Sequence, residues 1–584
     1  LVADTGNGGG HYDRGSVEFQ DPLRISGLNL PRSPYAGQPY TYAAVLSDPW
    51  STAEGAAYAF DFGDGQTLRS GTPSVGHTYA DQGSYDVSVT MTKADGSIFP
   101  STDIGHVQVQ PIAPLTESIG CSAHPSAPDT TTCDFSTGTS FYAPTSGKIS
   151  YGDGSAAVLD AGGSETLTHH YSAPGAYTVT RTVTDAGGRT ASATATAVVG
   201  PSYVQVWPTR VLDTRNGTGA KKAKIGPGGV VRVKVVGAAD MPAGGVRAVT
   251  MNVTDVNATS SGVVTAYADG TSRPVASNLN FLAGQISPNL VTVPVSKDGY
   301  VDLYNSFGSV DLVADVQGYY YDALPDSWVN VMSNTAPVDP VRVLDTRNGT
   351  GARKGIVGPG GSLTITLPGA GGLATQSALL HVTATGGTGN GVVTVACGSA
   401  YPPTASNLNY RAGQTVSNLV STGVCTGGKV TVYNSGSSVH LVADLQALAT
   451  DDYAGYSPVD DTSPVGLPFV PTAPTRFLDT RSGLGSRGAV GANGTVALKV
   501  AGVGSVPSSA RAVLVNLTGT GPTASTYITA YGAGPLPVAS TLNLAAGETR
   551  PALTLIPVDA DGYIHLHNFA GSVHLVADLE GYFG

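Results

Sequence analysis

The sequence predicts an all-β, multidomain protein in which two β-sandwiches are followed by three homologous, β-sandwich-like repeat domains. At 584 residues the chain exceeds what one hydrophobic core normally supports, so several domains are expected. Gly 77, Pro 38 and only 12% charged residues are typical of short strands joined by many turns rather than of helices. An internal repeat then fills the C-terminal part of the chain, which predicts copies of one domain.

Charge and cysteine content limit the location and the partners. The sequence has no run of about 18 apolar residues, so no membrane span is predicted. The net charge of −12 is spread along the chain, which does not suit nucleic acid. The four cysteines form two close pairs, Cys121 with Cys133 and Cys397 with Cys425. Such pairs indicate two local disulfides and an oxidising compartment, so we expect a secreted, extracellular protein at a cell surface.

The N-terminal third begins with a Gly-rich segment, residues 1–32, that shows no periodicity and is expected to be a tail or linker. Residues 33–112 then show alternating apolar residues between Gly/Asp turns, which indicates antiparallel strands. Within them, FDFGDG (Phe60 to Gly65) and HTYADQGSYDVSVT (His77 to Thr90) resemble the polycystic-kidney-disease (PKD) domain. This resemblance implies an immunoglobulin-like β-sandwich of the kind common in extracellular proteins.

A second module is expected over residues 113–200, because the same signals recur in the same order. ISYGDGS (Ile149 to Ser155) precedes HHYSAPGAYTVTRTVTDAGG (His169 to Gly188), so this segment also resembles a PKD domain. It differs by its ISYGDG turn and by the pair Cys121 and Cys133.

Three copies of one repeat follow. Their openings are RVLDTRNGTGA at Arg210 to Ala220, the same string at Arg342 to Ala352, and RFLDTRSGLGS at Arg476 to Ser486, a period of 132 to 134 residues. Each opening precedes the same ordered landmarks, ending in LVAD, and each copy is long enough for its own core. The expected domains are residues 201–322, 339–449 and 473–584, with linkers at 323–338 and 450–472. A pseudo-threefold unit within one chain is one possible arrangement. The repeat is similar to one in extracellular proteins of filamentous actinobacteria, where it accompanies PKD modules or enzymes.

A recurrent set of charged residues gives the first candidate ligand site. Each copy has an aspartate and an arginine in its opening motif and another aspartate in its last strand: Asp213, Arg215 and Asp315; Asp345, Arg347 and Asp444; Asp479, Arg481 and Asp578. Arginine binds carboxylates or phosphates, and aspartate accepts hydrogen bonds from sugar hydroxyls. The alternative is a structural lock between the first and last strands, because an unpaired charge in a hydrophobic strand is costly.

Asparagines give the second candidate site. The ASNLN segment, or STLN in the third copy, places amides that suit carbohydrate hydroxyls: Asn278 and Asn280, Asn407 and Asn409, and Asn543. They equally suit strand ends, where amides satisfy loose backbone groups. Tyrosines such as Tyr267 and Tyr304 recur nearby, either as stacking platforms for a sugar ring or as half-buried core residues.

No catalytic signature is recognisable in the sequence: GxSxG, HExxH, a Walker loop and a dinucleotide fingerprint are all missing. A metal site at His565, His567 and His574, or calcium at the Asp64 and Asp153 turns, is a weaker interpretation than a structural role. We therefore predict no cofactor, no metal and no enzyme activity, although a carboxylate pair of a glycosidase is not recognisable from spacing.

Two functions remain open from the sequence. In the first, the three repeats of an adhesin bind a cell-envelope or extracellular polysaccharide with avidity, and the PKD modules act as spacers. In the second, the chain is a structural subunit of an extracellular appendage, filament or particle, and its partners are other copies or proteins of that assembly.

Overall fold

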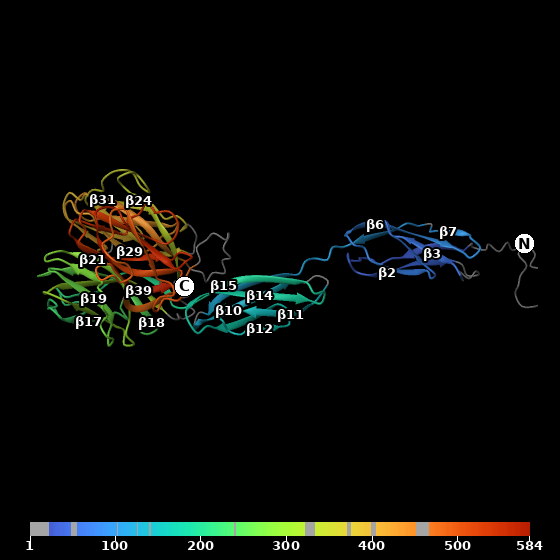
Figure 1. Ribbon diagram of the computed structural model, residues 1–584, viewed down its shortest axis with the longest axis horizontal. Coiled ribbons are helices and arrows are strands. Elements are labelled where there is room, and N and C mark those ends of the chain that lie inside the picture. Colours follow the sequence, from blue (N-terminus) through green and yellow to red (C-terminus); the bar gives the residue numbers. More distant parts are fainter. Residues whose placement is uncertain are drawn as a thin grey trace, which may run out of the picture.

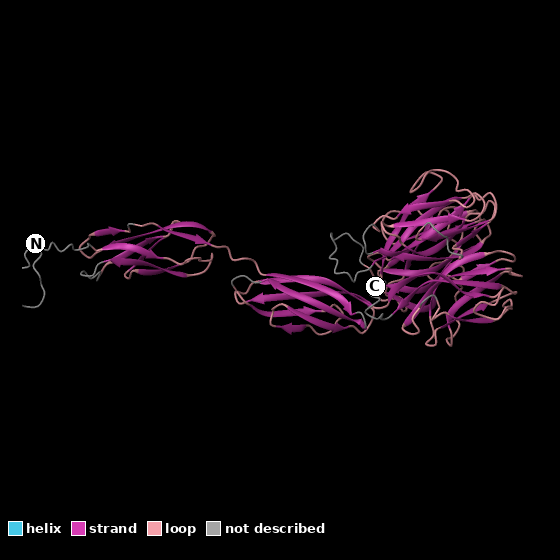
Figure 2. Ribbon diagram, turned by 180° about the vertical axis from the view of Figure 1, so that it is seen from behind, coloured by secondary structure: helices cyan, strands magenta, loops and turns pink. Residues whose placement is uncertain are grey.

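The computed structural model describes residues 23–47, 55–101, 103–124, 127–138, 142–238, 241–321, 333–370, 375–398, 405–450 and 466–584. Every regular element in these residues is a β-strand (Figure 2), which confirms the predicted all-β class. Two elongated sandwiches lie in a row and lead to a larger body formed by the C-terminal repeats (Figure 1). No described helix is long and apolar enough to cross a membrane.

The first sandwich has one sheet of order β1-β2-β5 and another of order β4-β3-β6-β7, with β8 paired to β6. Its strands are β1 (Arg24–Asn29), β2 (Tyr40–Ser47), β3 (Ala57–Asp61), β4 (Thr67–Ser70), β5 (Ser74–His77), β6 (Gly83–Thr92), β7 (Ile98–Pro100) and β8 (Gly105–Val109). Alternation along the strands turns one face inward. Tyr42, Phe60 and Tyr79 are buried there, and the Tyr79 hydroxyl donates to the Phe62 carbonyl at 2.9 Å.

The second sandwich has sheets β13-β10-β9 and β12-β11-β14-β15. Its strands are β9 (Thr116–His124), β10 (Ala127–Gly138), β11 (Pro144–Ser150), β12 (Val158–Asp160), β13 (Glu165–His170), β14 (Gly175–Asp185) and β15 (Thr190–Val199). Cys121 and Cys133 are cross-strand neighbours and form a disulfide. The fully buried Arg181 donates to the carboxylates of Glu117 and Asp160 at 3.0 and 2.7 Å, so its charge is neutralised inside the core.

Each repeat is a sandwich of an inner and an outer sheet of four strands. The inner sheets have the orders β16-β23-β18-β21, β24-β31-β26-β29 and β32-β39-β34-β37, and the outer sheets β17-β22-β19-β20, β25-β30-β27-β28 and β33-β38-β35-β36. The strands of repeat 1 are β16 (Ser202–Asp213), β17 (Val230–Lys234), β18 (Val246–Val256), β19 (Gly262–Ala268), β20 (Leu279–Phe281), β21 (Ser287–Pro294), β22 (Tyr300–Asn305) and β23 (Asp311–Tyr321). Those of repeat 2 are β24 (Asn334–Asp345), β25 (Ser362–Thr366), β26 (Thr375–Thr385), β27 (Gly391–Ala396), β28 (Leu408–Tyr410), β29 (Val416–Gly423), β30 (Lys429–Asn434) and β31 (His440–Thr450). Those of repeat 3 are β32 (Phe469–Asp479), β33 (Gly494–Lys499), β34 (Ala512–Thr520), β35 (Thr526–Tyr531), β36 (Leu542–Leu544), β37 (Thr549–Pro557), β38 (Tyr563–Asn568) and β39 (His574–Phe583).

The inner sheets are buried on both faces. All residues of β23 are buried, whereas β22 on the outer sheet alternates between buried and partly exposed positions. One face of each inner sheet packs on the outer sheet of its own repeat. The other face joins a core shared by the three repeats, which includes Tyr320, Leu419 and Phe469. The repeats therefore form one body, which we call the head, with the inner sheets at its centre.

The second sandwich joins the head through a very short connection. Only Gly200 and Pro201 separate β15 from β16. Gly200 has a φ of 132°, and a Cβ there would lie 2.7 Å from Pro174 and 2.9 Å from Pro468 of repeat 3. Glycine is required because a larger residue would collide with both prolines.

Two predicted features can be compared with the strands. The second disulfide, Cys397–Cys425, is formed in repeat 2, so both predicted pairings are confirmed. Four strands extend into segments predicted as tail or linker: β31 ends at Thr450, the first residue of 450–472, β1 lies within residues 1–32, β24 begins within 323–338 and β32 within 450–472. In the last two, Pro- and Asp-rich sequence forms an edge strand, a position that tolerates proline because its outer side needs no ladder bond.

Candidate functional site

The arginine that opens each repeat motif links the first strand to the last. Arg210 on β16 lies opposite Asp315 on β23, and its Nε and Nη2 donate to the two carboxylate oxygens at 2.8 and 3.0 Å. The equivalent pairs are Arg342 with Asp444 and Arg476 with Asp578. Sequence reasoning did not select these arginines, although each stands first in its motif.

The second arginine of the motif has a different role. Arg215 folds back on Asp213, with Nε–Oδ1 and Nη2–Oδ2 distances of 2.9 and 2.7 Å, rather than reaching the last strand. Arg347 with Asp345 and Arg481 with Asp479 repeat this geometry. Hydrogen bonds from these arginines lower the pKa of each motif aspartate, to about 2 for Asp479. The three arginine side chains are 43, 52 and 50% exposed, so their outer faces remain open to solvent.

Two of the last-strand aspartates also contact a neighbouring repeat. Asp578 accepts a hydrogen bond from the Ser277 amide of repeat 1 at 3.3 Å, and Asp444 accepts one from the Ser540 amide of repeat 3 at 3.2 Å. Burial raises the pKa of Asp444, although its bonds with Arg342 oppose that shift. These two carboxylates are thus occupied by the arginine of their own repeat and by the backbone amide of a neighbouring repeat.

A further residue of the last strand, two positions after each aspartate, closes the ring of repeats. Gln317 accepts from the Ser421 amide at 3.2 Å, Gln446 from the Leu555 amide at 3.3 Å, and Glu580 from the Thr292 amide at 3.0 Å. Repeat 1 thus bonds to repeat 2, repeat 2 to repeat 3, and repeat 3 to repeat 1. These contacts describe a pseudo-threefold ring, and sequence reasoning missed the three residues that make them.

The predicted asparagines lie at or near these junctions. Asn278 accepts from the Ala266 amide at 2.7 Å and donates to Glu580 at 2.5 Å. Asn407 accepts from the Val395 amide at 2.7 Å. Asn409 and Asn543 donate weakly, at 3.4 Å, to the serine three residues before them, and the buried Asn280 Oδ1 has no partner within the described residues.

A second set of amides is shared between repeats at two junctions but not at the third. Asn418 donates to Asn252 at 2.9 Å, and Asn289 donates to Asn516 at 2.8 Å. At the junction of repeats 2 and 3, the corresponding residues are His381 and Ala552. At this junction a histidine and an alanine therefore replace the amide pair. Neither ring nitrogen of His381 has a described partner, and burial lowers its pKa to about 3.

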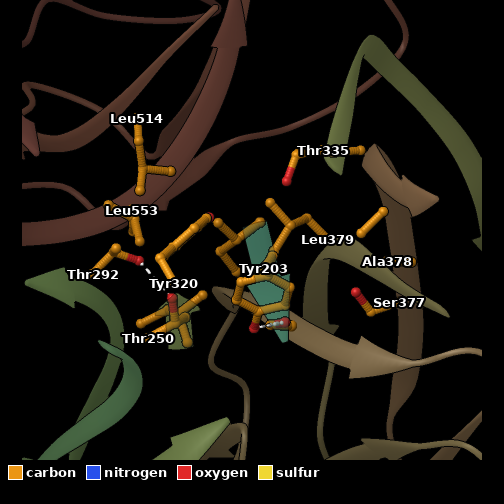
Figure 3. Close-up of a pocket in the computed structure, with 15 residues that line it drawn as sticks. Tyr203, Thr250, Thr292, Tyr320, Thr335, Ser377, Ala378, Leu379, Leu514 and Leu553 are labelled. Atoms are coloured by element: carbon orange, nitrogen blue, oxygen red, sulfur yellow. Dashed lines mark hydrogen bonds between the residues drawn. The ribbon is translucent and has the colours of Figure 1, made fainter. Parts of the chain in front are cut away.

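A small cavity lies where the repeats meet (Figure 3). Its volume is about 20 Å³, and residues of all the repeats line it, including Tyr203, Thr335 and Leu553. Tyr203 shares a hydrogen bond of 2.6 Å with Ser421 beside it. A cavity of this size holds about one water molecule, so this cavity between the described residues has no room for a larger ligand.

An open groove occurs at the outer edge of the junction between repeats 1 and 2. It measures about 120 Å³, and it is lined by Gln205–Pro208 of repeat 1 and by Val395–Cys397, Thr422 and Gly423 of repeat 2. Trp207 is 56% exposed beside it. In repeat 2 the corresponding residue is Asp339, which accepts from the Gly532 amide at 3.0 Å. In repeat 3 it is Ala473, so only this one of the described junctions presents an indole.

The weaker metal candidates have other partners. Asp64 and Asp153 lie 2.9 and 2.7 Å from His77 and His169, respectively. His565, His567 and His574 pair separately with Asp559, Thr495 and Thr480. No group of three or more metal-binding side chains comes together in the described residues.

The comparisons with known proteins identify the N-terminal sandwiches. Residues 27–104 and residues 112–199 each match a model of the PKD domain. The chain therefore contains two tandem PKD domains, which confirms the resemblance of the FDFGDG and ISYGDG segments.

No curated protein sequence matches this chain. Among solved structures, the fibronectin(III)-like modules of CbhA from Clostridium thermocellum are 14% identical, cover 29% of this chain and 88% of their own, and have a TM-score of 0.14. A bacterial ice-binding adhesin is 13% identical, covers 51% of this chain and 96% of its own, and has a TM-score of 0.22. Carbohydrate-binding modules of the β-sandwich superfamily are 13% identical, cover 52% of this chain and 97% of their own, and have a TM-score of 0.14. At such TM-scores these likenesses support no conclusion about function.

Proposed function

We propose that this protein is a non-enzymatic extracellular surface protein whose three repeats form one carbohydrate-binding head. The two PKD domains act as spacers that hold the head away from the surface. The ligand is a polysaccharide of a cell envelope or an extracellular matrix. The two disulfides support an oxidising location, where such proteins function.

The observation that carries this proposal is the Trp207 groove. An indole that is 56% exposed keeps a large apolar surface in water, although the other junctions place Asp339 or Ala473 there. A sugar ring presents a C–H face that covers an indole and hydroxyls at its rim that remain hydrated or bonded. The groove beside Trp207 leaves space for such a ring between two repeats.

The proposal assigns the recurrent polar motifs to assembly rather than to the ligand. Asp315, Asp444 and Asp578 hold an arginine of their own repeat, and two of them also hold a neighbour's amide. A sugar would have to displace these bonds. Of the predicted site residues, the half-exposed Arg215, Arg347 and Arg481 remain accessible for secondary contacts.

The test is retention of the full chain on insoluble, purified cell-envelope polysaccharides. Trp207→Ala is expected to lower the affinity about tenfold, the equivalent of ~1.4 kcal/mol. Phe569→Ala is the matched control, because Phe569 is 50% exposed on another part of the head and stacks on Tyr527. Equal retention of both variants, or no retention of the unmodified chain, would overturn the proposal. A discrete oligomer in light scattering without polysaccharide would favour a structural subunit instead.

A further inference from the structure

The outer sheet of repeat 1 differs from its counterparts in the hydrogen bonding of two positions on β22. On β22, inward residues alternate with the partly exposed Tyr300, Asp302 and Tyr304. At the position of Asp302, β30 carries Thr431 and β38 carries His565, whereas at the position of Tyr304 β30 also carries a tyrosine, Tyr433, and β38 carries His567. These positions can therefore be compared within one chain.

In repeats 2 and 3 the protein itself satisfies both positions. Where repeat 1 has Asp302, repeat 2 has Thr431, which bonds to Thr364 at 3.0 Å, and repeat 3 has His565, which bonds to Asp559 at 3.1 Å. Where repeat 1 has Tyr304, Tyr433 of repeat 2 donates to the Gly398 carbonyl. His567 of repeat 3 bonds to Thr495 at 2.9 Å.

In repeat 1 neither group has a hydrogen-bond partner within the described part of the chain. Arg232 lies directly across from Asp302 in the strand register, but its Nη2 donates to Asp269 at 2.7 Å instead. Burial, followed by the charge of Asp269, raises the pKa of Asp302. A half-buried carboxylate without a donor is costly, which favours a ligand that supplies donors.

Two guanidinium groups stack on Tyr300 and Tyr304, the residues two positions before and after Asp302 on β22. The Arg232 Cζ lies 3.5 Å from the ring centroid of Tyr300, and the Arg273 Cζ lies 3.8 Å from that of Tyr304. Tyr300, Asp302 and Tyr304 share the outward side of β22, so these stacks place planar donors over the rings on either side of Asp302 along the strand. The face therefore offers an acceptor between two sets of donors.

We propose that this face, formed by Asp302, Tyr304, Arg232 and Arg273, binds adjacent hydroxyl groups of a neutral sugar. One hydroxyl donates to Asp302 while its neighbour accepts from a guanidinium group or from the Tyr304 hydroxyl. The two arginines disfavour a cation, and the carboxylate disfavours an anion. The inference rests on the proposed carbohydrate-binding function but names a second surface, separate from the Trp207 groove.

The experiment measures affinity electrophoresis of the full chain in gels containing dextran, mannan or galactan as neutral probes, with polygalacturonate as an anionic probe. Asp302→Asn is expected to weaken retardation by at least one neutral polymer about tenfold, because the charged acceptor is lost. Thr431→Ala, at the same position in repeat 2, is the matched control and should keep the affinity of the unmodified chain. Thermal unfolding followed by circular dichroism verifies that each variant is folded.

The outcomes separate the two proposals. If a neutral polymer retards the chain and Asp302→Asn changes nothing, this site is wrong while the carbohydrate-binding function stands. If only polygalacturonate binds, or if Ca²⁺ alone raises the melting temperature and Asp302→Asn abolishes that rise, the assignment to a neutral sugar is overturned. If no polymer binds, both proposals fail. Loss of binding by Asp302→Asn with retention by Thr431→Ala supports the site.

Discussion

The inner and outer sheets of the head come from the same repeat sequence but have different constraints. In the inner sheets, Asp315, Asp444 and Asp578 each pair with the opening arginine of their repeat. In the outer sheets, the position of Asp302 is threonine in repeat 2 and histidine in repeat 3. The inner positions recur because each repeat joins its first and last strands through the same pair, whereas the outer-sheet position takes no part in that pair and differs between repeats.

This difference changes how recurrence within a chain should be interpreted. Polar residues that return in every copy are expected at a ligand site repeated three times, but here they hold the copies together. The candidates for binding, Trp207 and Asp302, occur where one repeat departs from the others. Four experiments test this contrast, in order of decreasing effect.

Removing an inner-sheet lock should have the largest effect. Asp578→Ala leaves Arg476 without its carboxylate and the Ser277 amide without its acceptor. We expect the free energy of unfolding of the head to fall by about 3 kcal/mol, measured by urea denaturation. Arg481→Ala is the control, because this half-exposed arginine should contribute less than about 1 kcal/mol. Similar losses in both variants would contradict the lock.

The acidic member of the ring should make one junction sensitive to pH. Burial raises the pKa of Glu580 to about 8. Its contribution to stability is therefore complete below the unfolded pKa of about 4.3 and is lost as pH rises through about 8. Glu580→Gln should remove this decline, so at pH 9 its free energy of unfolding, measured by denaturant melts, should exceed that of the unmodified chain by ~2 kcal/mol.

The complementary variant is Gln446→Glu at the junction of repeats 2 and 3. It should make the free energy of unfolding decline as pH rises. Asp255, whose pKa burial also raises to about 8, is unchanged in both variants, so the differences between curves isolate the ring residue. Parallel curves for Glu580→Gln and the unmodified chain would contradict the prediction.

The unequal junction offers a smaller effect. Ala552→Asn places an amide against the buried His381 and should cost ~1–2 kcal/mol by overpacking. Adding His381→Asn recreates the amide pair of the other junctions, so the double variant should recover at least ~1 kcal/mol in a double-mutant cycle. Strictly additive effects would show that the two residues do not face each other.

The same histidine should make this junction less stable at low pH. Because burial lowers the pKa of His381 to about 3, its contribution is present above the unfolded pKa of about 6.5 and is lost as pH falls toward 3. The double variant should lack this loss.

Changes on the outer surface should have the smallest effect on stability. Trp207→Ala and Asp302→Asn are expected to shift the free energy of unfolding by less than about 1 kcal/mol, because both side chains retain contact with solvent. Differential scanning calorimetry checks this directly. A large loss would mean that these residues belong to the assembly of the head after all.

The sequence was sufficient for features encoded locally. The FDFGDG and ISYGDG turns predicted the PKD domains, and the cysteine spacing predicted both disulfides. The repeat period predicted homologous sandwiches. The repeat period did not predict how the three repeats contact one another, because the bond between Ser277 and Asp578 joins residues 301 positions apart.

The choice between two arginines was also beyond the sequence. Arg210 and Arg215 flank Asp213 in the same motif, and either could have paired with Asp315. The strand pairing shifts register between Arg210 and Leu212, and Arg210 is the residue left opposite Asp315. Such an irregularity depends on both strands and leaves no separate mark in the motif.

Because the ring closes within one chain, repeat 1 is synthesised before the repeat that covers part of its inner sheet. The inner sheet of repeat 1 has Thr292 and Asn289 bonded to repeat 3, which follows repeats 1 and 2 along the chain. Until repeat 3 emerges, that sheet has an uncovered apolar face, which is the kind of surface that promotes association between unfinished chains. Interruption of synthesis after repeat 2 therefore leaves a product that is exposed to aggregation and proteolysis.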